Sequence, residues 1–276
     1  TRSNPPEAGS EAGLINRMRR GVWRLRGFAR SAPAAIGLVA VCLGVFLIQQ
    51  TAARVDFVAV YGYRYGYDQA LLHCFGLSWP LLREGFVWQL VTYMFLHASW
   101  QHLAMNMLTV LLLGSGLEAE IGGRRFKWIF LTGGLLGGLG WLMVTALTPL
   151  LPSAEALTQW LPRTAAAWLQ AGASSGQTLD VALCIGASGG VFALIGAYSA
   201  LFPRREVYVL LLFFPLRLKA RTLAWFLGAV TVAEAVFVQS RVAYAAHLAG
   251  GIAGYLCGCA LRTEAGDWRG GVPYGG

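Results

Sequence analysis

The feature that most constrains this chain is a series of apolar segments, each about as long as the hydrocarbon core of a membrane is thick. A helix needs roughly 20 predominantly apolar residues to cross that core. The composition agrees, because 56% of the 276 residues are hydrophobic and only 13% are charged, which excludes an ordinary soluble domain. We therefore predict an all-α polytopic membrane protein with six transmembrane helices, in the segments Ala34–Ala53, Ser99–Leu117, Trp128–Thr148, Ala182–Phe202, Thr222–Val238 and Val242–Leu261.

Two further segments are apolar or aromatic but are not expected to cross the membrane. Val207–Leu216 is short and contains the helix-breaking Pro215, so we expect it to lie in the membrane interface or to extend a neighbouring helix. Arg54–Ala98 is rich in Tyr and Trp, which favour the headgroup region, and we expect an interfacial hairpin there.

The net charge of +9 is explained by membrane topology rather than by a nucleic-acid partner. With six spans, 17 of the 22 Lys and Arg residues fall on one side of the membrane and five on the other. Basic residues accumulate on the cytoplasmic side of membrane proteins, where anionic lipid headgroups attract them. We therefore expect both termini to be cytoplasmic and no nucleic acid to be bound.

The segment 184–202 combines a glycine-rich start with an apolar helix. It begins Cys184-Ile-Gly186-Ala-Ser188-Gly189-Gly190. A serine in the first helical turn points its hydroxyl toward unpaired backbone N–H groups and the positive end of the helix dipole. Negative charge can develop there at low cost, which is what a serine nucleophile that attacks a carbonyl requires.

Three other polar residues fall at the same predicted depth as Ser188, in the outer half of the bilayer. His102 and Asn106 are four residues apart and share one face of the second predicted helix, and His247 lies near the start of the sixth. Each residue alone has a plain structural interpretation, because such a serine usually packs and a single His or Asn often only bonds to a neighbouring helix. All four at one depth predict a single polar pocket, since polar residues inside a membrane face a bundle interior or an aqueous cavity.

Two other sequence features bear on this pocket. Gly250-x-x-x-Gly254 is a close-packing motif that would let the sixth helix approach the fourth until Ser188 and His247 touch. The five cysteines form no CxxC pair and lie mostly in or near the spans, so we expect no disulfide framework and no zinc site.

These motifs resemble those of the rhomboid family of intramembrane serine proteases. The resemblance covers about residues 34–262 and rests on Gly186-x-Ser188-Gly189, His247 with Gly250-x-x-x-Gly254, the array His97, His102 and Asn106, and Glu118-x-x-x-Gly122. It implies a six-helix bundle with a water-filled cavity open to the outer side. From the resemblance together with the charge distribution, we expect a basic cytoplasmic tail at 1–33, a rhomboid-like membrane protease domain at 34–262 and a cytoplasmic tail at 263–276.

Carried over residue by residue, the resemblance implies a catalytic dyad and an oxyanion hole. Ser188 is similar to the nucleophile of the family and His247 to its general base. His102, Asn106 and the backbone N–H of Ser188 would form the oxyanion hole, and His97 would support it. The family implies no metal and no cofactor.

Other positions would support the dyad, and two depart from the family pattern. Gly186 and Gly189 flank the nucleophile, and Glu118 resembles a structural hydrogen-bond anchor. The family's Trp-Arg pair is Trp88-Gln89 here, so the role of that arginine is absent or replaced. The aromatic residue after the nucleophile is commonly Tyr, whereas Phe192 can stack on His247 but carries no hydroxyl.

The resemblance further implies partners and a location. The substrates would be membrane proteins, mainly with a single span, cut within the lipid bilayer near small and helix-breaking residues. Because 20 of the 22 basic residues are Arg and Ala and Gly are abundant, we expect a bacterial inner membrane. Two alternatives stay open: an inactive relative that only binds transmembrane helices, and a transporter with a proton relay through His102 and His247, which would not depend on Ser188.

Overall fold

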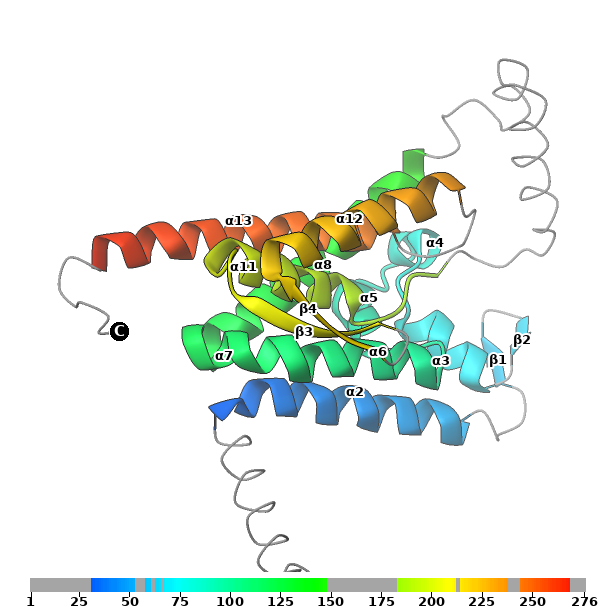
Figure 1. Ribbon diagram of the computed structural model, residues 1–276. Helices are drawn as coiled ribbons and strands as arrows, with labels where there is room; N and C mark the ends of the chain where they lie inside the picture. The colour runs from blue at the N-terminus through cyan, green and yellow to red at the C-terminus, as the bar shows by residue number, and fades with distance from the viewer. Residues whose placement is uncertain are drawn as a thin grey trace, which may run out of the picture.

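The computed structural model describes residues 31–52, 58–60, 63–65, 67–147, 183–211, 214–237 and 244–268, which are mostly helical (Figure 1). Most of the predicted tail 1–33, the end of the tail 263–276 and the segment between the third and fourth predicted spans fall outside these residues. The elements are α2 (Pro33–Ala52), β1 (Val58–Val60), β2 (Tyr63–Tyr65), α3 (Tyr67–Phe75), α4 (Trp79–Arg83), α5 (Gln89–Thr92), η1 (Tyr93–Phe95), α6 (Trp100–Thr109), η2 (Val110–Gly114), α7 (Ser115–Ile121), α8 (Gly123–Leu147), α11 (Ser188–Leu201), β3 (Glu206–Leu211), β4 (Phe214–Lys219), α12 (Ala220–Phe237) and α13 (Tyr244–Trp268).

Four of the described helices are long and apolar enough to cross a membrane. They are Pro33–Thr51, Trp100–Ile121, Gly123–Leu147 and Tyr244–Thr263, and the second consists of α6, the π-helical turn η2 and α7 in one continuous helix. Their outer faces carry large exposed apolar side chains, such as Ile252 at 61% exposure. Such faces suit lipid, because large apolar patches are unfavourable in water.

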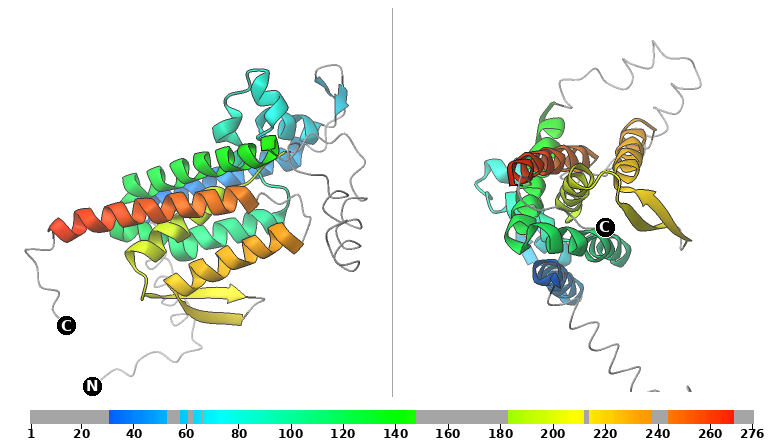
Figure 2. Two further views of the ribbon diagram at one scale, coloured as in Figure 1. Left: turned by 90° about the horizontal axis from the view of Figure 1, so that it is seen from above. Right: turned by 60° about the vertical axis from the view of Figure 1, so that its left-hand side comes forward.

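The centre of the bundle is α11, a shorter apolar helix of 14 residues. Its length is roughly 21 Å at 1.5 Å per residue, less than the thickness of the hydrocarbon core. Eleven of its residues are buried, so α11 is enclosed by other helices rather than exposed to lipid (Figure 2).

Glycines, which have no side chain, allow α8, α11 and α13 to pack closely. A Cβ atom on Gly250 would overlap the carbonyl oxygen of Gly189, and a Cβ atom on Gly254 would overlap the backbone of Ala193. The predicted role of Gly250-x-x-x-Gly254 in bringing the two helices together is therefore confirmed.

Helix α2 is attached to the rest of the bundle by polar contacts at both ends. At its start, the two carboxylate oxygens of Glu118 accept hydrogen bonds from the backbone N–H groups of Ala34 at 2.8 Å and Ala35 at 2.7 Å. At its other end, the side-chain amide of Gln49 exchanges two hydrogen bonds of 3.2 Å with the backbone of His97. Glu118 is thus a structural hydrogen-bond anchor, as the resemblance implies.

In the described residues of the outer segment 54–98, β1 and β2 pair as a hairpin, and the short helices α3, α4, α5 and η1 follow them. The fully buried Gln89 connects these helices. Its Nε2 donates to the carbonyl oxygen of His73 at 2.7 Å, and its Oε1 accepts from the N–H of Ser78 at 3.2 Å. Gln89 therefore satisfies backbone groups of the outer segment at the position where the resemblance implies an arginine.

The apolar segment 207–216 does not extend a helix, and that part of the prediction is wrong. It forms most of the antiparallel hairpin of β3 and β4, which lies beside α12 at the periphery of the bundle (Figure 2). Its β-branched and aromatic residues favour strands, and Pro215 disfavours a helix. The base of the hairpin is closed by a hydrogen bond of 2.9 Å from the N–H of Ala220 to the carbonyl oxygen of Arg205.

Candidate active site

The chain reaches Ser188 through a short non-helical segment that is fixed to the outer segment. The backbone groups of Cys184 exchange two hydrogen bonds of 2.9 Å with those of Leu77, and the N–H of Gly186 donates to the carbonyl oxygen of Tyr93 at 2.9 Å. Gly186 has a φ of +122°, a backbone conformation that residues other than glycine rarely adopt. This bend makes Ser188 the first residue of α11, as the sequence predicts.

The structure brings His247 of α13 against Ser188, although the two are 59 residues apart in the chain. His247 Nε2 lies 2.8 Å from Ser188 Oγ, within hydrogen-bond distance. The imidazole ring stacks on the ring of Phe192, with centroids 4.5 Å apart and an angle of 3° between the planes. Ser188, His247 and Phe192 are only partly buried, so the pair is not fully enclosed by the bundle.

His102 lies directly beside the bend that precedes Ser188. A Cβ atom on Gly186 would be 2.6 Å from His102 Cε1 and 2.7 Å from its Nε2, so only a glycine leaves room for this imidazole. Ser99 begins helix α6 by accepting the N–H of His102 at 3.1 Å, which fixes the start of this helix. The predicted neighbour Asn106 donates from Nδ2 to the carbonyl oxygen of His102 at 3.0 Å, which occupies one of its two amide hydrogens.

His97 contacts the site through His102. It is 1% exposed, its Nδ1 lies 3.3 Å from the carbonyl oxygen of Phe95, and its ring meets the ring of His102 edge-on with centroids 5.2 Å apart. Burial, followed by the neighbouring His102, lowers the pKa of His97 to about 4. Within the described part of the chain its Nε2 has no hydrogen-bond partner. This placement suits a supporting residue.

The second predicted glycine, Gly189, lies where α11 touches α13. A Cβ atom on it would be 3.6 Å from the carbonyl oxygen of Ala246, the residue before His247.

Three residues that fix the site are absent from the sequence-based prediction: Leu77, Tyr93 and Gln49. Leu77 acts through its backbone groups, and Tyr93 through both its backbone carbonyl and its hydroxyl, and neither position carries a pattern that would mark it in the sequence. Gln49, a polar residue near the end of an apolar segment, does leave one.

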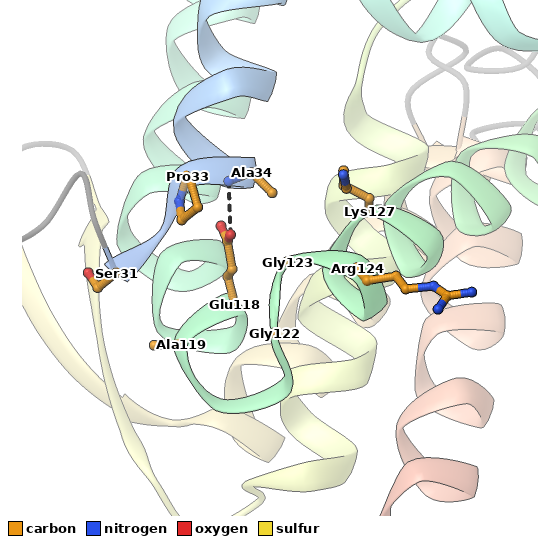
Figure 3. A pocket seen from close by; sticks show the side chains of 9 residues that line it. All are labelled: Ser31, Pro33, Ala34, Glu118, Ala119, Gly122, Gly123, Arg124 and Lys127. Carbon is orange, nitrogen blue, oxygen red and sulfur yellow. Dashed lines mark hydrogen bonds between the residues drawn. The ribbon is translucent and has the colours of Figure 1, made fainter.

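A cavity of about 530 Å³ lies far from the Ser188–His247 pair, where α7 ends and α2 and α8 begin (Figure 3). Figure 3 shows Glu118 pointing across it toward the N–H of Ala34. Glu118 lies 16 residues after His102 along one continuous helix, which is roughly 24 Å at 1.5 Å per residue. The cavity therefore belongs to the attachment of α2, and we assign it no role in chemistry.

The class of protein is now defined. It is a helical integral membrane protein in which a serine at the start of a buried helix lies within hydrogen-bond distance of a histidine on a neighbouring helix. Comparison with known proteins then gives the family. The family model described as "Rhomboid domain" matches residues 84–264, more than half of the chain. The chain belongs to the rhomboid family.

Its curated relatives include one whose name states that it is inactive. The chain is 27% identical to RHOMBOID-like protein 5 of Arabidopsis thaliana over 66% of its own length and 46% of the relative's. It is 28% identical to the mitochondrial Rhomboid protein 1 of Saccharomyces cerevisiae over 59% of its length and 39% of the relative's. A shorter match, 33% identical over 25% of the chain and 20% of the relative, is to Inactive RHOMBOID-like protein 8 of Arabidopsis thaliana. The chain thus spans less than half of the length of the first two relatives.

Proposed function

We propose that this protein is an intramembrane serine endopeptidase that cleaves transmembrane segments of other membrane proteins. The observation that carries the proposal is the distance of 2.8 Å between His247 Nε2 and Ser188 Oγ at the start of α11. A nucleophile and a base within hydrogen-bond reach are the diagnostic pair of covalent acyl-transfer catalysis. Membership of the rhomboid family supports the same reaction.

In the first step, Ser188 Oγ attacks the carbonyl carbon of the scissile peptide bond while His247 Nε2 takes the hydroxyl proton. The electron pair of the carbonyl moves to its oxygen, which becomes an oxyanion. The backbone N–H of Ser188, in the first turn of α11, offers an unpaired donor at the positive end of the helix dipole. His102 beside Gly186 and the remaining amide hydrogen of Asn106 are the other proposed donors.

In the second step, the carbon–nitrogen bond breaks, and the leaving amine takes the proton from His247. A water molecule then attacks the acyl group on Ser188 and gives a proton to His247, which returns it to Ser188 Oγ as the product acid leaves. The dyad needs an imidazole held in one orientation, and the parallel stacking of Phe192 on His247 supplies this restraint.

The substrates and topology that we propose follow the family and the charge distribution. A single-span substrate helix would unwind locally at small or helix-breaking residues, because its peptide bonds are otherwise protected by internal hydrogen bonds. We propose six transmembrane helices, a water-filled cavity open to the outer side, and both termini in the cytoplasm of a bacterial cell, since 17 of 22 basic residues fall on one side of this arrangement.

The proposal is tested by cleavage of a single-span substrate in proteoliposomes. Wild-type protein should cleave it and should react with a fluorophosphonate probe at Ser188, whereas Ser188→Ala and His247→Ala should do neither. Ser199→Ala is the matched control, because Ser199 is a buried serine on the same helix whose hydroxyl bonds to the carbonyl oxygen of Gly196 at 2.8 Å. Cleavage that persists in Ser188→Ala would rule out the serine mechanism.

The second candidate function is binding of transmembrane helices without cleavage. It is favoured by one observation, the match to a relative whose name calls it inactive. This function predicts that a single-span protein is captured equally by wild type and Ser188→Ala and that neither variant reacts with the fluorophosphonate. Covalent labelling of the wild type but not of Ser188→Ala would exclude binding without cleavage.

A further inference from the structure

We propose that Tyr93 is the positioning residue that fixes Ser188 in place, by holding the chain on both sides of the nucleophile. This inference rests on the proposed serine protease function and adds a residue that the family motifs above do not contain. Tyr93 is 1% exposed and lies in η1, in the outer segment, 95 residues before Ser188 in the chain.

The backbone of Tyr93 holds the chain before the nucleophile. Its carbonyl oxygen accepts the N–H of Gly186 at 2.9 Å, two residues before Ser188. Because Gly186 takes a positive φ, the direction of the chain changes at this residue, and the bond to Tyr93 fixes where the bend lies.

The side chain of Tyr93 reaches the chain after the nucleophile. A Cβ atom on Gly189 would lie 3.4 Å from the Tyr93 hydroxyl, and one on Gly138 would lie 3.0 Å from its Cε1 atom and 3.2 Å from the hydroxyl. The ring therefore runs between the glycine-lined face of α8 and the first turn of α11, and it ends beside the residue that follows Ser188.

The hydroxyl of Tyr93 attaches its ring to α8 by a hydrogen bond. It donates a hydrogen bond of 2.6 Å to the carbonyl oxygen of Gly134. Since α8 also packs against α13, where a Cβ atom on Gly137 would lie 2.7 Å from the carbonyl oxygen of Ala246, one helix supports both members of the Ser188–His247 pair. Tyr93 links the nucleophile to that support.

The hydroxyl should matter for the rate of the chemical step rather than for binding of the substrate. A displacement of about 1 Å at a catalytic group costs on the order of 100-fold in rate. Loss of a single hydrogen bond, with the ring retained, leaves a smaller displacement, for which we expect about a 10-fold effect.

The test compares Tyr93→Phe with Tyr198→Phe in the full chain. Tyr198 is the matched control, because it is a buried tyrosine on α11 itself, ten residues after Ser188. In Tyr93→Phe we expect kcat and the rate of fluorophosphonate labelling to fall together by about 10-fold while KM changes less than 2-fold. Tyr198→Phe should retain both rates at a similar thermal stability.

Equal rates in the two variants, or a loss in Tyr93→Phe that appears in KM alone, would overturn the proposal. Hydrogen exchange separates its failure from the failure of the proposed function. If the wild type neither cleaves nor labels, the protease function fails, and the exchange of the Gly186 amide still tests the geometric part. We expect that exchange to be faster in Tyr93→Phe than in the wild type and unchanged in Tyr198→Phe. Unchanged exchange in Tyr93→Phe would show that the hydroxyl does not hold the bend.

Discussion

At the scale of single residues, the candidate site holds its imidazole by packing. The ring of His247 lies parallel to the ring of Phe192, one turn after Ser188 on α11, so the helix that carries the nucleophile also orients the base. In this arrangement the orientation of His247 depends on an apolar side chain, which can be changed without altering the charge of the site.

We predict that Phe192→Ala slows the reaction without preventing it. An aromatic stacking contact contributes about 0.5–1.5 kcal/mol beyond area burial, which corresponds to about 2- to 10-fold in rate. Phe192→Tyr, which keeps the ring, should label with fluorophosphonate at close to the wild-type rate. Labelling kinetics of both variants check this, and equal rates for wild type and Phe192→Ala would mean that stacking does not orient the base.

His97 should make stability depend on pH between about 6.5 and 4. Its pKa is lowered to about 4 in the folded protein by burial and by His102, whereas an accessible imidazole has a pKa near 6.5. Between these values the unfolded chain binds a proton at this position that the folded chain does not, so the free energy of unfolding falls as the pH falls. The loss amounts to about 3 kcal/mol and is absent above pH 6.5.

This dependence can be measured by unfolding the purified protein in mixed detergent micelles at pH 7 and at pH 4.5. Wild type should be less stable at the lower pH, and the difference should be smaller in His97→Asn, which cannot take up the proton. The same measurement on His102→Asn shows how much of the pH dependence comes from His102, whose ring contacts that of His97. An unchanged pH dependence in His97→Asn would assign the effect to other groups.

At the scale of elements, the site depends on how closely α11 and α13 approach. We predict that Gly254→Ala separates them, because the added methyl group would overlap the backbone of Ala193, which cannot move aside as a side chain would. Overpacking of this kind costs about 1–3 kcal/mol, and displacement of His247 from Ser188 should lower kcat by about 100-fold. Gly44→Ala on α2 is the control, because a Cβ atom there meets nothing within 4 Å. Assays of cleavage and thermal unfolding of both variants check this.

The elements differ in how far the sequence predicts them. Apolar length alone predicts α2, the α6–α7 helix, α8 and α13, because crossing a membrane fixes both the length and the polarity of a helix. The segment 207–216 is too short to cross and has no distinctive period, so only its β-branched and aromatic residues and Pro215 favour the strands β3 and β4 over a helix.

The same contrast holds within the candidate site. Ser188 and His247 could be paired from the sequence, because position along a spanning helix translates into depth in the membrane. The contacts of Tyr93 with Gly186 and of Gln89 with Ser78 could not, since they join segments whose approach is set by tertiary packing. Gln89 also shows that an amide can satisfy backbone groups where the family pattern has a guanidinium.

At the scale of the whole molecule, α2 lies outside the matched Rhomboid domain of residues 84–264, yet it is attached to that domain at two points. Glu118 binds its first turn and Gln49 binds the segment before α6. The second contact reaches the backbone of His97, whose ring touches His102. Helix α2 therefore supports the candidate site at one end and the turn between α7 and α8 at the other.

We predict that these two attachments act independently. Gln49 lies 15 residues after Ala34 on α2, roughly 22 Å at 1.5 Å per residue, and effects of sites more than about 10 Å apart usually add. Glu118→Ala removes two hydrogen bonds to a charged group and should cost about 3 kcal/mol, and Gln49→Ala should cost about 1–2 kcal/mol. Unfolding in detergent should show that the double variant loses the sum of the two single losses, within about 0.5 kcal/mol.

Gln50→Ala, at an exposed neighbouring position, is the control. Only Gln49→Ala should also slow fluorophosphonate labelling, because only this contact leads to His97 and His102, and a double variant far less stable than the sum would mean that α2 docks as one cooperative unit.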